Sequence, residues 1–168
     1  VLTSNTIYNG TATGTTTIDK VTVDGLYTLD NGGSDTFPSA TGGFVGFVLG
    51  RLTVIDSTVK NSKIISKRYA GGLAGKLGNP EHEFKIKDVT IDNSIIASVG
   101  DKKGAGGIVG TSNQGKVPVY GYEILIKDTA VGYWLNNNGS PTTNTTIDAV
   151  KELKLPTDKD NNIGSTIG

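Results

Sequence analysis

An oxygen-rich segment near the C-terminus is the stretch of this sequence whose residue types and spacing best suit an ion. Asp158, Asp160 and Asn162 alternate along it, and Gly164 follows. Carboxylate and amide oxygens at alternate positions before a glycine are typical of calcium ligands. The glycine comes one position later than in an EF-hand loop, however, and no glutamate occupies the twelfth position. The sequence therefore predicts a calcium candidate at these three residues, with a solvated polar tail as the alternative and no other cofactor.

His82, the only histidine, offers the next chemistry to weigh. It lies between Glu81 and Glu83, directly after Pro80. One histidine with two carboxylates can contribute to a zinc site, but this spacing is more typical of a solvated loop. A Ser-His-Asp triad would have to use the same histidine, and no nucleophile-elbow motif accompanies it. The sequence therefore predicts no catalytic residue.

The composition argues against several classes of function. The 168 residues carry 16 basic and 16 acidic side chains, so no broad field attracts nucleic acid or an anionic membrane. No run of about 18 apolar residues is present, so no membrane-spanning helix is predicted. The chain has no cysteine and no methionine, which suits an extracellular setting and leaves the fold without disulfides.

The most prominent pattern is a five-residue phrase, Gly-Gly-x-x-Gly, that occurs three times about thirty residues apart. The copies are Gly42 to Gly46, Gly71 to Gly75 and Gly106 to Gly110. Such recurrence predicts a repeat architecture, in which each unit buries its apolar face against its neighbours. Glycine at these places predicts a tight corner or a close approach of backbones that a Cβ atom would block.

A second pattern follows the glycine phrase. Shifted by 32 positions, residues 52–64 match residues 84–96, with Val54 on Ile86, Asp56 on Asp88, Val59 on Ile91 and Asn61 on Asn93. A looser copy is predicted with Ile126, Asp128 and Val131 in the places of Val54, Asp56 and Val59. An earlier copy is predicted with Ile18, Lys20, Val23 and Gly25. These copies are 36, 32 and 40 residues apart.

Each unit alternates apolar and polar residues and ends in turn residues, which is typical of short β-strands. The sequence therefore predicts an all-β fold, a β-helix-like solenoid of about four coils over residues 1–135. Residues 136–168 are predicted to form an irregular C-terminal cap or assembly extension, with a strand or a short helix capped by Asp148 at 147–155. Stacked asparagines at the corners are expected to hydrogen-bond to one another, and stacked aspartates to lie exposed.

With the Gly-Gly-x-x-Gly strand and the aliphatic-x-Asp-x-x-aliphatic strand, the chain resembles the GLUG-repeat family. These repeats occur in bacterial cell-surface and adhesin-like proteins and in the N-terminal regions of immunoglobulin A metallopeptidases. The resemblance implies a right-handed solenoid, a secreted bacterial protein at the cell surface and no catalytic residue to carry over. The His-Glu-x-x-His zinc motif of the peptidase members is absent from this sequence.

The ends of the predicted solenoid indicate its partners. Uncovered coil ends present strand edges that pair with other protein, so we expect strand-edge or end-to-end pairing, including pairing between copies of this chain. Tyr120, Tyr122, Tyr133 and Trp134 lie near the last coil. Their predicted role is to cover the open end of the core, and the alternative is to stack on a surface carbohydrate.

Two functions of different classes follow from these patterns. The first is a non-catalytic, extracellular structural or adhesive module that presents a surface or assembles into a fibre. The alternative is a carbohydrate-active β-helix enzyme, either a polysaccharide lyase or a glycoside hydrolase. An enzyme needs two carboxylates that converge in one groove, whereas a structural module keeps its acids at corners in the register of the repeat.

Overall fold

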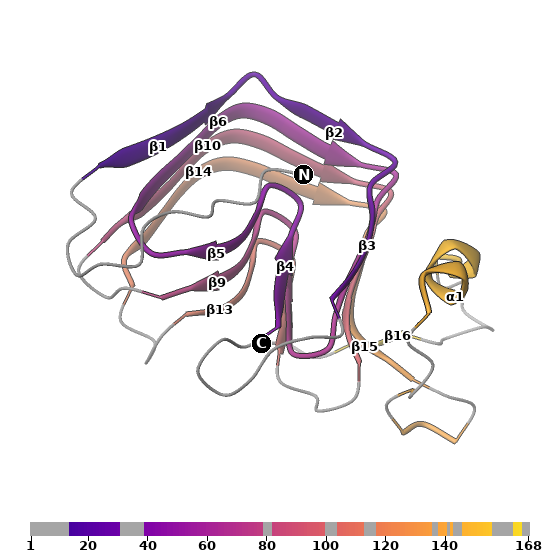
Figure 1. Ribbon diagram of the computed structural model, residues 1–168. Coiled ribbons are helices and arrows are strands. Elements are labelled where there is room, and N and C mark those ends of the chain that lie inside the picture. The colour runs from indigo at the N-terminus through magenta and orange to yellow at the C-terminus, as the bar shows by residue number, and fades with distance from the viewer. Residues whose placement is uncertain are drawn as a thin grey trace.

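Parallel β-strands dominate the computed structural model of this chain (Figure 1). The structure describes residues 14–30, 39–78, 82–99, 104–112, 117–135, 138–140, 142, 146–155 and 163–165. Within these residues the strands form four sheets, and a single short helix lies beside them. The all-β prediction is confirmed.

The first two sheets hold the longest strands. The first sheet has the order β1-β6-β10-β14, with β2 also on β6, and its strands are β1 (Thr15–Asp19), β2 (Thr22–Asp24), β6 (Arg51–Lys60), β10 (Phe84–Asp92) and β14 (Val119–Lys127). The second sheet has the order β16-β15-β11-β7-β3, and its strands are β3 (Tyr27–Asp30), β7 (Lys63–Ser66), β11 (Ile95–Ser98), β15 (Ala130–Trp134) and β16 (Ile163–Ser165). All of these pairings are parallel except that of β16 with β15.

Two shorter sheets contain the glycine phrases. The third sheet is β12-β8-β4, from β4 (Ala40–Gly42), β8 (Tyr69–Gly71) and β12 (Gly104–Gly106). The fourth is β13-β9-β5, from β5 (Val45–Val48), β9 (Ala74–Leu77) and β13 (Val109–Ser112). The chain passes through the four sheets in the same order as β6 to β9 and again as β10 to β13, an arrangement that fits a β-solenoid.

The register between strands tests the predicted copies directly. Val54 pairs with Ile18 on one side and with Ile86 on the other, and Val59 pairs likewise with Val23 and Ile91. The predicted spacings of 36 and 32 residues are therefore confirmed.

The predicted third copy is wrong by five residues. Ile126 pairs with Ile91 rather than Ile86, and Val131 pairs with Ile96 rather than Ile91. The last spacing is thus 35 residues, as between Ile91 and Ile126, and not 40. The true partner of Ile86 is Gly121, which hides the aliphatic signal. The first sheet has two corners five residues apart, and at both of them a turn residue stands between aliphatic residues. The residues at the second corner of the last copy therefore match the first corner of the earlier copies in sequence.

The core lies between the inward faces of the sheets. In β10 the side chains of Phe84, Ile86, Val89 and Ile91 are all buried, whereas Lys85 is exposed. They belong to one continuous cluster that includes Val54, Val59 and the glycine-phrase residues Leu73 and Ala74. A period of two separates core from surface on each side of Asp88, and the phase shifts by one residue at that corner.

The glycine phrases are explained by close approach rather than by a left-handed backbone. None of their glycines has a positive φ. A Cβ on Gly72 would collide with the carbonyl oxygen of Gly107 in the next unit and lie 2.5 Å from Cδ1 of Ile91. Both predicted reasons hold, at different positions: the second glycine of a phrase approaches the next unit, whereas a Cβ on the first, as at Gly71, would meet the Ala74 carbonyl oxygen of its own tight corner.

The C-terminal region packs beside the second sheet. Helix α1 (Ile147–Glu152) begins at Thr146, whose hydroxyl accepts a hydrogen bond from the Ala149 amide. The predicted cap at Asp148 is wrong, since that residue lies in the first turn of the helix. Val150 and Leu153 are buried with Ile65, Ile95 and Trp134 in a second apolar cluster. The helix therefore covers the outer face of the second sheet, and β16 pairs with the edge of β15.

Among the described helical residues, no segment is both apolar and long enough to cross a bilayer.

Candidate functional site on the first sheet

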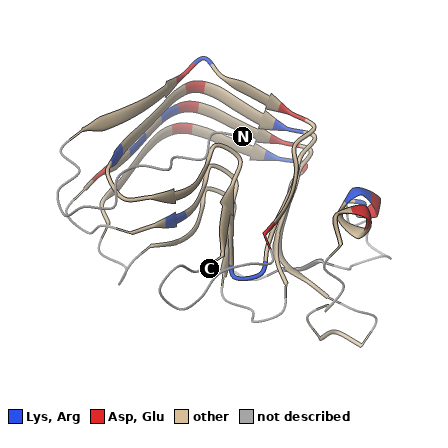
Figure 2. Cartoon of the chain, viewed as in Figure 1, with Lys and Arg blue, Asp and Glu red and all other residues tan. Residues whose placement is uncertain are grey.

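The outer face of the first sheet arranges polar residues in columns that run from strand to strand. Outward residues at equivalent places pair directly, as Thr58 does with Thr22 and Thr90. One column alternates in charge, with Asp24, Lys60, Asp92 and Lys127 in that order. Within it, Lys60 Nζ lies 3.2 Å from Asp24 Oδ2, and Lys127 Nζ lies 3.2 Å from Asp92 Oδ2. Figure 2 shows these charges aligned along the sheet.

The strands of this sheet bend at two corners, and both bends use the left-handed backbone conformation. The first corner has positive φ at Lys20, Asp56, Asp88 and Glu123. The second has positive φ at Gly25, Asn61, Asn93 and Asp128. Asn and Asp tolerate this conformation better than most residues. The acidic residues of the first corner therefore serve the turn, and Glu123 rather than Asp128 completes their column.

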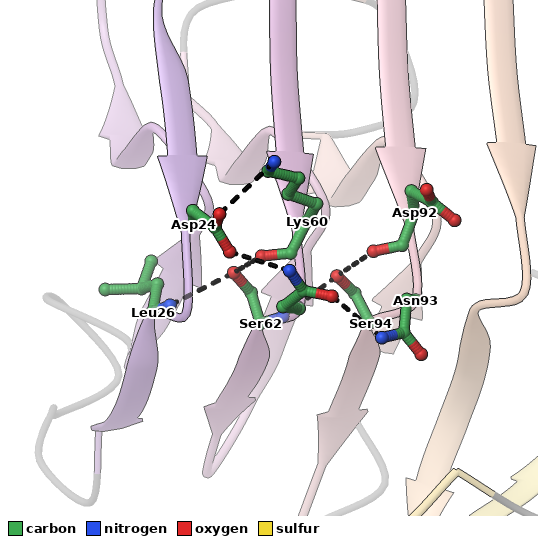
Figure 3. A network of polar contacts seen from close by, with 8 residues as sticks. Asp24, Leu26, Lys60, Ser62, Asp92, Asn93 and Ser94 are labelled. Atoms are coloured by element: carbon green, nitrogen blue, oxygen red, sulfur yellow. Dashed lines mark hydrogen bonds and ion pairs between the residues drawn. The ribbon is translucent and has the colours of Figure 1, made fainter.

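A ladder of side-chain amides joins the second corner from strand to strand (Figure 3). Asn93 Nδ2 donates to Asn61 Oδ1 at 2.8 Å. Asn61 Nδ2 donates in turn to Asp24 Oδ1 at 2.7 Å. The predicted asparagine stacking is confirmed, and the ladder ends on a carboxylate that accepts without having to donate.

At the second corner, Asn61, Asn93 and Asp128 are each followed directly by a residue with a hydroxyl. Each hydroxyl bonds to a backbone carbonyl in its own strand and to a backbone amide of the neighbouring strand. Ser62 Oγ donates to its own strand at the Lys60 carbonyl, at 2.7 Å, and accepts from the Leu26 amide at 3.1 Å. Ser94 Oγ repeats this with the Asp92 carbonyl at 2.7 Å and the Ser62 amide at 3.1 Å. Thr129 Oγ1 donates to the Lys127 carbonyl at 2.7 Å and accepts from the Ser94 amide at 3.3 Å.

The role of these hydroxyls was not predicted from the sequence, although a signal was present. In the sequence, Asn-Ser occurs twice at equivalent places and Asp-Thr takes the third. A small polar residue followed directly by Ser or Thr is the pattern that the corner needs, because the hydroxyl bridges the turn and the neighbouring strand.

Electrostatics differ between the two corners. Hydrogen bonds from Asn61 and Lys60 hold the pKa of Asp24 below its ordinary value. At the first corner, Asp88 and Glu123 hydrogen-bond to each other, which lowers the pKa of Asp88 and raises that of Glu123. When two carboxyls are in contact, the protonated one donates to the ionised one, so their pKa values move in opposite directions. The first corner therefore has an acidic pair, Asp88 and Glu123, on the last two strands of the first sheet, β10 and β14.

The aromatic residues of the last strands divide into two groups. Tyr120 and Tyr122 are 58% and 62% exposed, and they pair with Lys85 and Lys87, which point outward. Trp134 is buried in the cluster beneath α1. The predicted covering of the open core end is therefore wrong for the two tyrosines, because the inward places beside them belong to Val119 and Gly121.

The candidate ion site cannot be placed. Asp158, Asp160 and Asn162 lie outside the described residues. Among the residues that the structure does describe, no group of three histidine, cysteine or acidic side chains is arranged to hold a metal. Both ring nitrogens of His82 are buried without a hydrogen-bond partner in the described part of the chain. The calcium assignment stays a prediction.

Comparison with known proteins gives no family for this chain: no family model, no curated protein and no solved structure matches it significantly.

Proposed function

We propose that this chain is a non-catalytic structural or adhesive module, exposed outside a bacterial cell or on its surface, that presents the outer face of the first sheet. In this proposal the fold is a right-handed β-solenoid of about four coils, the last represented by β14 and β15. The resemblance to GLUG repeats motivates the handedness and the location. The repeated order of strands and their uniform register support the solenoid.

The observation that carries the proposal is the placement of the carboxylates on the first sheet. Asp56, Asp88 and Glu123 occupy one corner column with positive φ, and Asp24 and Asp92 alternate with lysines. Their positions are therefore explained by turns and ion pairs. Residues that form turns and ion pairs recur with each unit, as expected for a scaffold.

A glycoside hydrolase, one of the two forms of the alternative function, needs a carboxyl geometry that the acidic pair does not have. Hydrolysis of a glycosidic bond requires two carboxyls about 5 Å or more apart, with the sugar between them. Asp88 and Glu123 are instead hydrogen-bonded to each other. Carboxyls in hydrogen-bond contact are closer together than that geometry requires, so the pair supports the non-catalytic proposal.

The test combines a cleavage assay with a binding assay on the full chain. The protein is incubated with neutral and uronic-acid polysaccharides, and new reducing ends and unsaturated products are measured. Binding to the same polysaccharides in insoluble form and to host-cell surfaces is measured in parallel. We expect no cleavage, and protease accessibility of the protein on intact source cells. Cleavage that is lost in Asp88→Asn or Glu123→Gln would replace the proposal with the enzyme alternative.

A further inference from the structure

We propose that the free edge of β14 binds the β1–β2 edge of a second copy of this chain, head to tail and in parallel register. The inference deepens the proposed function, on which it rests, by naming the partner and the two surfaces that an assembling module would use. Four observations carry it: an unpaired edge, exposed apolar residues, a continuous register and complementary charge.

The first observation is the state of the two strand edges. Within the described residues, β14 pairs with β10 alone, and β1 and β2 pair with β6 alone. Backbone hydrogen bonds cross each second corner in the same way, from Asn61 N to Asp92 O at 3.1 Å and from Asn93 N to Lys127 O at 3.3 Å. The equivalent amide of Asp128 points to the open side. On the other edge, the equivalent acceptor is the carbonyl oxygen of Asp24.

The second observation is that β14 holds most of the exposed apolar surface found in the described residues. Of the seven large exposed hydrophobic side chains there, five lie on this strand: Val119, Tyr120, Tyr122, Leu125 and Ile126. Ile126 is the informative one, because its column partners Val59 and Ile91 are fully buried while it is 41% exposed. A long edge with exposed apolar residues is a site for strand addition.

The third observation is that the two edges fit each other at both corners. The corners are five residues apart on every strand, as with Lys20 and Gly25 at one edge and Glu123 and Asp128 at the other. A copy placed one strand beyond β14 therefore sets its Lys20 on Glu123 and its Val23 on Ile126. Its Asp24 then lies on Lys127.

The fourth observation is the charge that this register brings together. Lys127 would extend the alternating column by meeting Asp24 of the second copy, as Lys60 meets Asp24 within the chain. Lys20 of the second copy would face Glu123, whose neighbour in its own chain is the acidic Asp88. A symmetric pairing of β14 with β14 about the same corner would instead place Glu123 on Glu123. Charge therefore favours head-to-tail pairing.

One element competes with this arrangement. In strict continuation, β3 of the second copy would extend the second sheet beyond β15. Strand β16 already pairs there, with Gly132, Tyr133 and Trp134. As far as the described residues go, the first sheet is open to a second copy, whereas the second sheet becomes open only when β16 leaves. Strand β16 therefore limits how tightly two copies join.

The test uses two variants that each block one edge, measured by sedimentation over a range of concentrations. Ile126→Lys places a charge on the inward side of β14, and Val23→Glu does so on β2. Each variant alone should associate at least about tenfold more weakly than the wild type. An equimolar mixture should recover 1:1 dimers, because it retains one wild-type β14 edge and one wild-type β1–β2 edge.

Matched controls separate blocked edges from damaged folds. Leu125→Lys and Thr22→Glu place the same charges one residue away on the outer face, where the side chains stay in solvent, and both should weaken association less than Ile126→Lys and Val23→Glu do. Glu123→Lys gives an independent check, since it removes a like charge beside Asp88 but sets a lysine against Lys20 of the second copy. It should leave the melting temperature equal or higher and still weaken association.

Three results would overturn the inference. The first is a wild-type chain that stays monomeric at every concentration. The second is association of Ile126→Lys or Val23→Glu at wild-type strength. The third is a mixture that fails to dimerise although both variants are folded. None of these results touches the non-catalytic assignment, which only polysaccharide cleavage would contradict.

Discussion

At the scale of single residues, the first sheet is shaped by backbone conformations that most side chains avoid. All seven described non-glycine residues with positive φ lie at its two corners: Lys20, Asp56, Asn61, Asp88, Asn93, Glu123 and Asp128. The left-handed conformation costs roughly 1–2 kcal/mol for an ordinary residue and less for Asn or Asp. The polar corner residues are therefore selected by the turn, and their side chains then join neighbouring strands.

Substitutions at Asn61 separate the free-energy cost of the left-handed backbone from the stabilisation that the side-chain hydrogen bonds of the ladder provide. Asn61→Ala should lower the free energy of unfolding by about 1–2 kcal/mol, because it removes two side-chain hydrogen bonds and places alanine in the left-handed conformation. Asn61→Gly should cost less, since glycine accepts that backbone, as Gly25 does in the same column. Urea titration measures both. Equal losses for the two variants would mean that backbone conformation contributes nothing at this corner.

Gly72 tests the close approach between units. Gly72→Val should lower the melting temperature far more than a surface substitution, because its Cβ would meet the Gly107 carbonyl oxygen and Cδ1 of Ile91, both fixed by packing. Gly14→Ala is the matched control, since nothing lies within 4 Å of a Cβ there. Thermal unfolding followed by circular dichroism compares them. A Gly72→Val chain that melts like the wild type would refute the packing explanation.

The acidic pair at the first corner predicts a dependence on pH. Glu123 has a raised pKa, so the folded state loses stability as the pH rises through that pKa, above the ordinary value of 4.5. Asp88 has a lowered pKa, so its contribution is lost only as the pH falls through its folded value, below 3.8. The contribution of this pair to the stability of the wild type should therefore be largest in the mildly acidic range in which the pair holds one proton.

Glu123→Gln isolates this effect, because a neutral amide donates to Asp88 at every pH. The variant should lack the decline that the wild type shows as the pH rises above that range. The difference should be small and reduced by salt, since both carboxyls are exposed. Melting temperatures across the pH range provide the measurement. Identical pH profiles for the two proteins would show that the carboxyls do not share a proton.

At the scale of elements, periodicity predicted strands well and the last register poorly. The alternation of Phe84 and Ile86, and of Val89 and Ile91, with polar residues indicated the strands and their inward faces, because burial follows a period of two on each side of the corner. The register of β14 could not be obtained in the same way, because Gly121 replaces the aliphatic and Glu123 replaces the aspartate. The hydroxyl bridges at Ser62, Ser94 and Thr129 depend on neighbouring strands, so their role became visible only with the pairing.

The sequence did not decide between a strand and a helix for residues 147–155, because six residues do not form a stable helix on their own. In the structure the stability of helix α1 comes from burying Val150 and Leu153 against the second sheet, in the cluster with Trp134. Trp134 is the only tryptophan, so its fluorescence reports on this contact. Val150→Asp should shift its emission to longer wavelength while the far-ultraviolet signal of the strands persists.

Ile147→Asp is the matched control for α1, because Ile147 is exposed on the same helix. Its emission should match that of the wild type. An unchanged Trp134 spectrum in folded Val150→Asp would show that α1 does not cover this face of the sheet.

At the scale of the whole molecule, the strands form a single stack in which units of unequal length keep common columns. Unequal spacings of 36, 32 and 35 residues bring Thr22, Thr58, Thr90 and Leu125 into one outward column. The extra residues of the longer units must therefore lie outside the first sheet. The proposed surface role and the proposed pairing of copies both require this column to be continuous.

Disulfide trapping tests that stack most directly, because the chain has no cysteine of its own. Neighbouring parallel strands lie about 4.8 Å apart, within the Cα separation that a disulfide allows. The pairs Thr22→Cys with Thr58→Cys, Thr58→Cys with Thr90→Cys, and Thr90→Cys with Leu125→Cys should each close under mild oxidation, as intact mass and thiol titration would show. Thr90→Cys with Ala130→Cys, which represents a 40-residue spacing, should stay reduced. Closure of that pair, with Thr90→Cys and Leu125→Cys left open, would contradict the stack described here.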